Sequence, residues 1–271
     1  MRRLRTLLVL DAKLALQHKL VHVTVAVALV FGLLIRLALP AEVELGVGLD
    51  ALAGIDPDAL DALGKDWSVT VLDPGAQKPP FDLLFIPILL ALDLCLLGFM
   101  FGAVMMLQDK QNNTIAALRV TPATAWDYLG AKLLVNLGLS ALNLLVLVAV
   151  AAPAFLLEPI LWALVLLACM GMTALGMAIA VFIRSIAQFF YPLMLVGLLA
   201  STPLYMVFEP TAALSWTRAL PTYQLLFGSE ALLFAGDPAL VAEALIYLGC
   251  FALVATLLCT ALVHARLLRP A

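Results

Sequence analysis

The sequence predicts an all-α integral membrane protein in which residues 1–271 form a single transmembrane domain. Composition is the first reason, because 65% of the residues are hydrophobic, only 12% are charged and the mean hydropathy is +1.11, whereas soluble domains carry about 25% charged residues. The second reason is that six apolar runs each reach the roughly 20 residues that a helix needs to cross a bilayer. The third is the polar, helix-prone stretch 108–132, which lies between two of these runs.

The six expected transmembrane spans are joined by polar or Pro- and Gly-rich connections. They are Leu20–Leu39, Leu83–Leu107, Leu129–Ala152, Ile160–Ile183, Phe189–Phe208 and Leu240–Val263. Before them, residues 1–19 begin basic and continue apolar, but polar residues interrupt the run and no small-residue cleavage site follows. We therefore expect an interfacial helix there rather than a cleaved signal peptide. The remaining segments are a loop at 40–82, a hairpin at 108–128 and a loop at 209–239.

The basic residues predict the orientation, because Lys and Arg in short loops are retained on the cytoplasmic side. One side of the predicted bundle carries 11 of the 15 basic residues. They are Arg2, Arg3, Arg5, Lys13, Lys19, Lys110, Arg119, Lys132, Arg184, Arg266 and Arg269. Both termini and the 108–128 hairpin are thus expected to be cytoplasmic, in an inner (cytoplasmic) membrane. The 40–82 loop, which holds eight acids between residues 41 and 80, is expected to be an external, solvated loop.

Soluble enzyme chemistry finds no support in the sequence. It contains no GxSxG, HExxH or GxxxxGK[ST] motif, so we assign no catalytic, metal-binding or cofactor-binding residue. Without a loop that cradles phosphates, the chain is not expected to bind ATP by itself. Its net charge of −3 also argues against a nucleic-acid partner.

Polar residues inside the spans are the candidates for a translocation path, because an ionised group at mid-membrane usually faces protein or water. Asp93 is the only acid near the middle of a span, and Asn136, Ser140 and Asn143 follow at i, i+4 and i+7 on one helix face. These side chains either line a path or form hydrogen bonds between packed helices, and both interpretations stay open. The small-residue motif at Gly98–Gly102 predicts close helix packing within the subunit.

The polar stretch 108–132 predicts a helical hairpin at the membrane surface. Asp109–Val120 has the pattern of a short, imperfectly amphipathic helix that is too polar to enter the bilayer. Thr121-Pro122 ends it, since the residue before proline avoids the helical region. Thr124 and Asp127 then have the spacing of a capping box, which begins the next helix. Such a hairpin offers a rigid surface to a soluble partner.

This hairpin resembles the corresponding segment in membrane subunits of type 2 ABC exporters. The matching residues are Asp109, Thr114, Val120-Thr121-Pro122, Tyr128 and Lys132, in a pattern close to E-x-x-x-G-T-x-x-x-L-x-V-T-P-x-x-x-x-x-Y-x-x-x-K. Two positions depart from it: Asp109 stands where Glu is usual, and Asn113 stands where Gly is usual. Asn is among the residues that tolerate a left-handed backbone. The stretch from Trp216 and Leu220-Pro221-Thr222-Tyr223 onward is also similar to the external segment before the last span of that family.

The resemblance implies a homodimer or heterodimer of permease subunits in the lipid bilayer, with the substrate path at the dimer interface. It also implies separate ABC ATPase subunits that bind ATP and Mg²⁺ and dock on the hairpin. The ATPase-coupling residues that it implies are Asp109, Thr114, Arg119, Thr121, Pro122 and Asp127. Within the family the chain looks most similar to small drug-efflux permeases, including the fluoroquinolone-exporting type, so export of a small amphiphilic compound is expected. The alternative is an ion- or proton-coupled secondary transporter.

Overall fold

The computed structural model describes residues 2–17, 19–38, 81–119, 121, 124–208 and 215–268, and all regular secondary structure in these ranges is helical. Six helical segments are long and apolar enough to cross a membrane. The predicted all-α membrane protein with six spanning helices is therefore confirmed. The 40–82 loop lies almost entirely outside the described residues.

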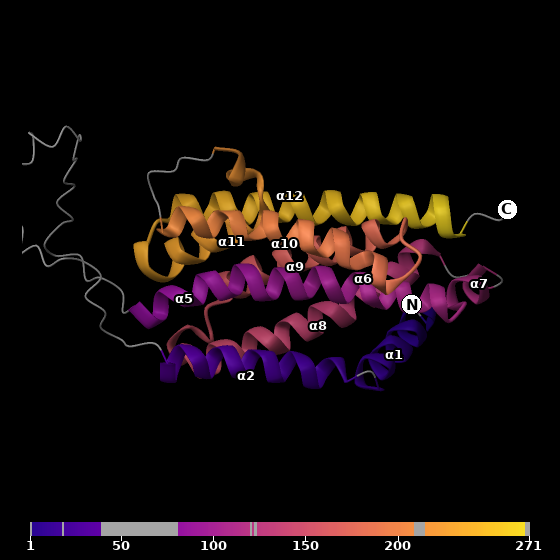
Figure 1. Ribbon diagram of the computed structural model, residues 1–271, viewed down its shortest axis with the longest axis horizontal. Helices are drawn as coiled ribbons and strands as arrows, with labels where there is room; N and C mark the ends of the chain where they lie inside the picture. Colours follow the sequence, from indigo (N-terminus) through magenta and orange to yellow (C-terminus); the bar gives the residue numbers. More distant parts are fainter. Residues whose placement is uncertain are drawn as a thin grey trace, which may run out of the picture.

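The bundle is elongated, and its long helices run roughly along one axis (Figure 1). The spanning segments are α2 (Leu20–Ala38), α5 to α6 (Phe81–Leu89 and Cys95–Gln111), α8 (Ala125–Ala151), α9 (Pro159–Ala180), α10 (Ile186–Phe208) and α12 (Pro238–Val263). At one end lie α1 (Arg2–Gln17), α7 (Thr114–Arg119) and the C-terminal end of α12 (Figure 1). We call this the α7 end. The chain segments that the sequence predicts to be cytoplasmic thus lie together at one end.

Helix α9 forms the centre of the bundle, with 67% of the residues in its membrane-spanning stretch buried. It packs against α6, α8 and α12. Helices α6 and α9 approach closely because a glycine on each helix leaves room for the backbone of the other: a Cβ atom on Gly102 would lie 2.7 Å from the Thr173 carbonyl oxygen, and one on Gly176 would collide with the Phe99 carbonyl. The predicted packing role of Gly98–Gly102 within the subunit is confirmed, since both glycines contact α9 of the same chain.

The second span is not a uniform α-helix. Pro87 lies inside α5, where it removes a backbone donor and its ring crowds the preceding turn. The chain then passes through one π-helical turn, η1 (Leu90–Leu94), before α6 continues the helix. Such π-helical turns are rare and frequently occur at functional sites. Asp93 lies in this turn.

Lys110 ties the end of α6 to the end of α9. Its Nζ atom donates hydrogen bonds to the carbonyls of Ala180, Val181 and Ile183, at 2.6, 2.7 and 2.9 Å. The last carbonyls of a helix lack partners within the helix and carry partial negative charge, so a lysine is well suited to this position. The α7 end of α9 is therefore fixed by a side chain from α6.

The segment expected as a loop at 209–239 is largely helical in its described part, residues 215–239. It contains η3 (Ser215–Ala219), α11 (Pro221–Glu230) and the π-helical turn η4 (Ala231–Ala235). Helix α11 packs against α5, α9 and α12, at the end of the bundle opposite to α7 (Figure 1). Gln224 is buried and donates a hydrogen bond to the Arg218 carbonyl at 2.9 Å. This segment thus closes one end of the bundle.

Candidate functional site

A buried cluster of charged side chains lies at the α7 end, where α1, α6 and α8 meet. The Lys132 Nζ atom is 2.6 Å from Asp109 Oδ2 and 3.2 Å from Asp11 Oδ1. Tyr128 donates a hydrogen bond from its hydroxyl to Asp109 Oδ2 at 2.8 Å. All four residues are buried, with exposed fractions of 2 to 6%. We call Asp11, Asp109, Tyr128 and Lys132 the ion cluster.

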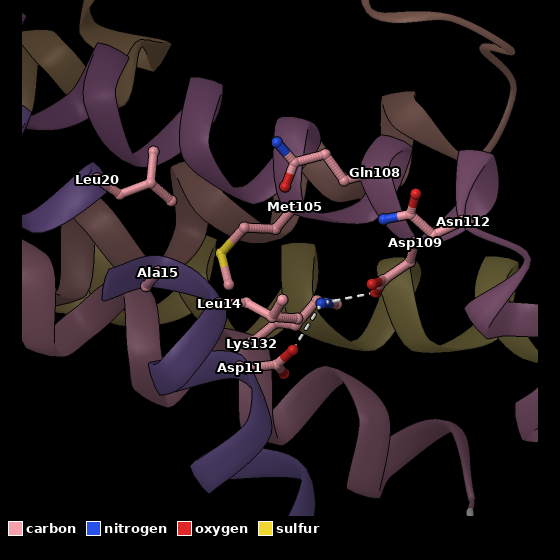
Figure 2. Close-up of a pocket in the computed structure, with 9 residues that line it drawn as sticks. All are labelled: Asp11, Leu14, Ala15, Leu20, Met105, Gln108, Asp109, Asn112 and Lys132. Atoms are coloured by element: carbon pink, nitrogen blue, oxygen red, sulfur yellow. Dashed lines mark hydrogen bonds and ion pairs between the residues drawn. The ribbon is translucent and has the colours of Figure 1, made fainter. Parts of the chain in front are cut away.

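Figure 2 shows Lys132 reaching between the two carboxylates, Asp11 from α1 and Asp109 from α6. A cavity of about 20 Å³ adjoins them, which is room for roughly one water molecule. Two buried acids share one cation here, so one negative charge is left without an equal partner. Burial raises the pKa of the Asp11 carboxyl, an effect that Lys132 partly offsets and that Asp109 reinforces.

The ion cluster holds the base of the hairpin to the rest of the bundle. Removing one member of a buried ion pair typically costs about 3–5 kcal/mol, because the other charge stays buried without compensation. Asp109 is in the last turns of α6 and Lys132 is in the second turn of α8, so the pair fixes the two helices that flank the hairpin. Through Asp11 the same lysine also holds α1. A movement of the hairpin is therefore coupled to α1 and to two spans.

The hairpin turns at Asn112 and Asn113. Helix α6 ends at Gln111, and Asn113 adopts a left-handed backbone with φ of 56°. This is the conformation that the Asn-for-Gly departure allows, since Asn enters this region more readily than most residues. The six-residue α7 follows, and Ile115 and Leu118 bury their side chains on the bundle side.

The predicted capping box at the start of α8 is confirmed. The Asp127 backbone N–H donates to Thr124 Oγ1 at 3.2 Å, and the Thr124 backbone N–H donates to Asp127 Oδ2 at 3.1 Å. These bonds satisfy two amide donors at the helix start and fix its direction. Thr121 closes the end of α7, with its hydroxyl donating to the Leu118 carbonyl at 2.8 Å.

Two details of the predicted hairpin are wrong. The short helix does not extend over Asp109–Val120, because α6 continues to Gln111 and α7 covers only Thr114–Arg119. Asp109, which the resemblance implies as an ATPase-coupling residue, is also not at the surface of the hairpin, because it faces the bundle and pairs with Lys132. The exposed residues of this stretch include Asn112, Asn113 and Thr121, and Thr114 is half-buried. Pro122 and the side chain of Arg119 lie outside the described residues.

An open apolar groove of about 890 Å³ lies between α2, the η1–α6 segment and α10. Its walls are mainly leucine, methionine and phenylalanine side chains, and Asp93 is the ionisable residue among those that line it. Helix α10, on one side of the groove, has only 11% of the residues in its membrane-spanning stretch buried. The groove is thus a recess in the lipid-facing surface of the single chain.

The four candidate path residues separate into two environments. Asp93 lines the groove, and Asn143 Nδ2 donates to its Oδ2 atom at 3.0 Å. Asn136 instead donates to Thr173 Oγ1 and, at 3.4 Å, to the Gly98 carbonyl. Asn136, Ser140 and Asn143 are all buried between helices and do not line the groove. The stripe on α8 therefore forms contacts between helices, and only Asp93 faces the open space.

Asp11 was not singled out in the sequence, and Tyr128 and Lys132 were named there only as residues of the family pattern. A signal was present, because Asp11 is the only acid in residues 1–41, where the other charged residues are all basic. A lone acid on the apolar face of an interfacial helix is costly unless it finds a cation. Within the described chain, no three His, Cys, Asp or Glu side chains gather as a metal site.

The bundle, its groove and its buried ion cluster define a polytopic membrane protein with a structured hairpin at one end. Residues 67–261 match the model of the family described as ABC-2 family transporter proteins. The match covers more than half of the chain, and the chain belongs to this family. It is accordingly the membrane subunit of a transporter. No curated protein and no solved structure matches the chain significantly.

Proposed function

We propose that this chain is the permease subunit of an ATP-driven ABC exporter and that it moves a small amphiphilic compound out of the cytoplasm. In this proposal, separate ATPase subunits bind ATP and Mg²⁺ and dock at the α7 end. Both termini are then cytoplasmic and the membrane is the inner membrane. The ion cluster carries the proposal, because it joins the hairpin to α1, α6 and α8 and so provides a rigid route from a docked ATPase to the spans.

The charge at the α7 end supports this orientation. Lys110 lies near that end of α6 and Lys132 in the first turns of α8, Arg184 lies in the connection between α9 and α10, and Arg266 follows α12. Basic residues are retained on the cytoplasmic side during insertion, and the surface next to an ATPase would be the cytoplasmic one. The exposed tip at Asn112 and Asn113, followed by α7, is the surface that we propose for docking.

A dimer is supported by the uneven burial of the spanning helices. Helix α10 is 11% buried, whereas α9 is 67% buried, and α10 exposes large side chains such as Phe190, Tyr191 and Leu198. Two copies that face each other across α10 and α2 would enclose their grooves as one path of sufficient size for a drug-like compound. Pockets for such ligands usually measure about 300–1,000 Å³.

Reconstitution with the partner tests the proposal. The tagged chain would carry a photo-crosslinking residue at Asn112, which is exposed at the hairpin tip, and the captured partner would be identified by mass spectrometry. An equivalent probe at Asp237, at the opposite end, is the matched control. We expect an ATPase to be captured only from Asn112, and the purified assembly to transport substrate into inside-out vesicles only with hydrolysable ATP. Transport driven by a proton gradient without nucleotide would favour the secondary-transporter alternative.

A further inference from the structure

Asp93 lines the apolar groove. One of its carboxylate oxygens accepts a hydrogen bond, and the other has no partner among the described residues. Asn143, itself only 1% exposed, donates to Oδ2 at 3.0 Å. Among the residues that the structure describes, neither a second hydrogen bond nor an ion pair involves Asp93. The carboxylate is therefore oriented from behind by α8, while its other oxygen has no cation from this part of the chain.

The helix geometry around Asp93 supports a binding role. A carboxylate in a regular lipid-facing helix would be costly in the membrane interior. Here the π-helical turn Leu90–Leu94, which follows Pro87, interrupts the regular α-helix where Asp93 lies. The neighbours Leu90 and Leu94 are buried in the bundle, while Asp93 lines the groove. In this turn, an irregular backbone carries Asp93, whose carboxylate accepts a hydrogen bond from the buried side-chain amide of Asn143.

The other walls of the groove define the rest of the ligand. Phe31 from α2, Met100 from α6, and Leu193, Met194 and Leu198 from α10 surround the space with apolar surface. Ser201 is the only other polar side chain among the lining residues. The volume of about 890 Å³ is within the range of sites for drug-sized molecules. A ligand with an apolar body fits these walls. A positive charge on that ligand would pair with the Asp93 carboxylate, which has no cationic partner among the described residues.

We propose that the groove binds amphiphilic organic cations, with the positive charge of the ligand paired to Asp93 and its apolar body against α2 and α10. This inference rests on the proposed export function and specifies its substrate class. Charge selection follows from electrostatics, because an ion pair is much stronger in a medium of low dielectric constant than in water. An anion of the same shape would instead be repelled by Asp93.

Binding of tetraphenylphosphonium to the full chain in lipid nanodiscs tests the inference, with empty nanodiscs as the background. Tetraphenylborate has the same shape and the opposite charge, and triphenylphosphine oxide is a neutral probe of related shape. We expect measurable affinity for tetraphenylphosphonium alone. Asp93→Asn should weaken it about tenfold or more, because the partner charge is lost, and Asp93→Glu should retain most of it. Glu243→Gln is the matched control, because it makes the same carboxylate-to-amide change at an exposed position of α12 outside the groove, and it should change affinity by no more than about twofold.

Three results of the binding measurements would overturn the inference: equal binding of the three probes by the wild type, unchanged affinity in Asp93→Asn, or an equal loss in Asp93→Glu and Asp93→Asn. If Asp93→Asn does not fold, the comparison of the three probes on the wild type decides alone. ATP-driven transport by the chain with its ATPase separates this inference from the proposed function. Transport of neutral or anionic compounds only, with ATP required, would retain the exporter and reject the cation site. Cation binding without any ATP-driven transport would retain the cation site and reject the exporter.

Discussion

Lys132 on α8 lies 2.6 Å from Asp109 on α6, and the two residues flank the hairpin from opposite sides. The same ammonium group is 3.2 Å from Asp11 on α1. A single buried cation therefore joins the N-terminal helix to the two spans that carry the hairpin. Because interior ion pairs are hardly screened by salt, this connection should persist at high ionic strength.

Replacing Lys132 should destabilise the protein strongly. In Lys132→Met, the carboxylates of Asp11 and Asp109 remain buried without a cation, and we expect a loss of about 3–5 kcal/mol in the free energy of unfolding. Thermal denaturation in detergent measures it. Lys13→Ala is the control, because Lys13 is exposed on α1 and its loss should cost about 0.5 kcal/mol or less. A Lys132→Met protein as stable as this control would show that the ion cluster is not structurally important.

Stability should also depend on the titration of Asp11. The pKa of this carboxyl is raised above its ordinary value of 3.8 in the folded protein, mainly by burial. The folded state then binds its proton more tightly than the unfolded state does. The stability from this proton is fully present below pH 3.8 and is lost as the pH rises through the raised folded pKa.

Asp11→Asn isolates this effect, since asparagine has nearly the same shape and cannot titrate. The melting temperature of Asp11→Asn relative to the wild type should rise as the pH increases above 3.8, and should level off once Asp11 is fully ionised. The groups that face Asp11 are Lys132 and Asp109, with Tyr128 beyond them, and they are unchanged in both proteins. A difference that stays constant or falls with increasing pH would contradict the assignment.

Substitutions in the hairpin should distinguish docking of the ATPase from coupling of ATP hydrolysis to transport. If α7 is the docking surface, Arg119→Ala should weaken association with the ATPase by about two- to fivefold, as expected for the loss of one charged partner at an interface. Thr124→Ala should leave association intact but lower transport per ATP, because loss of the cap costs the start of α8 about 1 kcal/mol. Pro122→Ala should act like Thr124→Ala by relaxing the turn. Copurification, ATP hydrolysis and vesicle uptake would be measured on each variant.

A substitution at a buried residue, Asp109→Asn, serves as the comparison for these three variants. Asp109→Asn faces the bundle, so it should lower stability and transport without changing the affinity of the ATPase for the exposed tip. If Arg119→Ala, Thr124→Ala and Pro122→Ala all leave association and transport unchanged, the hairpin is not the coupling element.

Local sequence information was sufficient for the spans and for the hairpin cap. The length of each apolar run locates a spanning helix within a few residues, and the Thr124–Asp127 box depends only on residues three apart. The pairing of Asp11 with Lys132 could not be predicted in this way, because it depends on how α1 folds back onto α8. The burial of Asp109 could not be predicted for the same reason, since its partner lies on another helix.

The groove was likewise beyond sequence reasoning. Asp93 and Asn143 were both recognised as polar residues within spans, but the open side of Asp93 depends on α10 lying apart from the central helices. A hydropathy pattern gives the number of spans and does not give their contacts. The same limit explains why α11, which is short and mixed in polarity, was included in a loop.

The orientation in the membrane should place Asn112 and Asp237 on opposite sides. Cysteines introduced at these exposed or half-exposed positions would be labelled with a membrane-impermeant maleimide in intact cells, after Cys250→Ser removes the exposed native thiol. The other three native cysteines are buried and can remain. We expect labelling at Asp237 and none at Asn112 until the cells are permeabilised. Labelling of Asn112 in intact cells would reverse the topology.

The contact between α6 and α9 should tolerate no added methyl group. In Gly102→Ala the new Cβ would lie 2.7 Å from both the Thr173 carbonyl oxygen and its Cγ2 atom, a distance at which the backbones must separate. Overpacking of this kind typically costs about 1–3 kcal/mol. Because Thr173 also accepts a hydrogen bond from Asn136, the displacement would disturb the polar contact between α8 and α9 as well.

Gly138→Ala is the matched control, because Gly138 lies inside α8 with no atom within 4 Å of the added Cβ. It should be neutral or stabilise the helix by about 0.5–1 kcal/mol, since glycine is the more flexible residue in the unfolded chain. Thermal denaturation of the purified chain, compared at several protein concentrations, separates packing within the subunit from packing between copies. A loss in Gly102→Ala that is independent of concentration is the expected result. A Gly102→Ala protein as stable as Gly138→Ala would instead contradict the expected clash with Thr173.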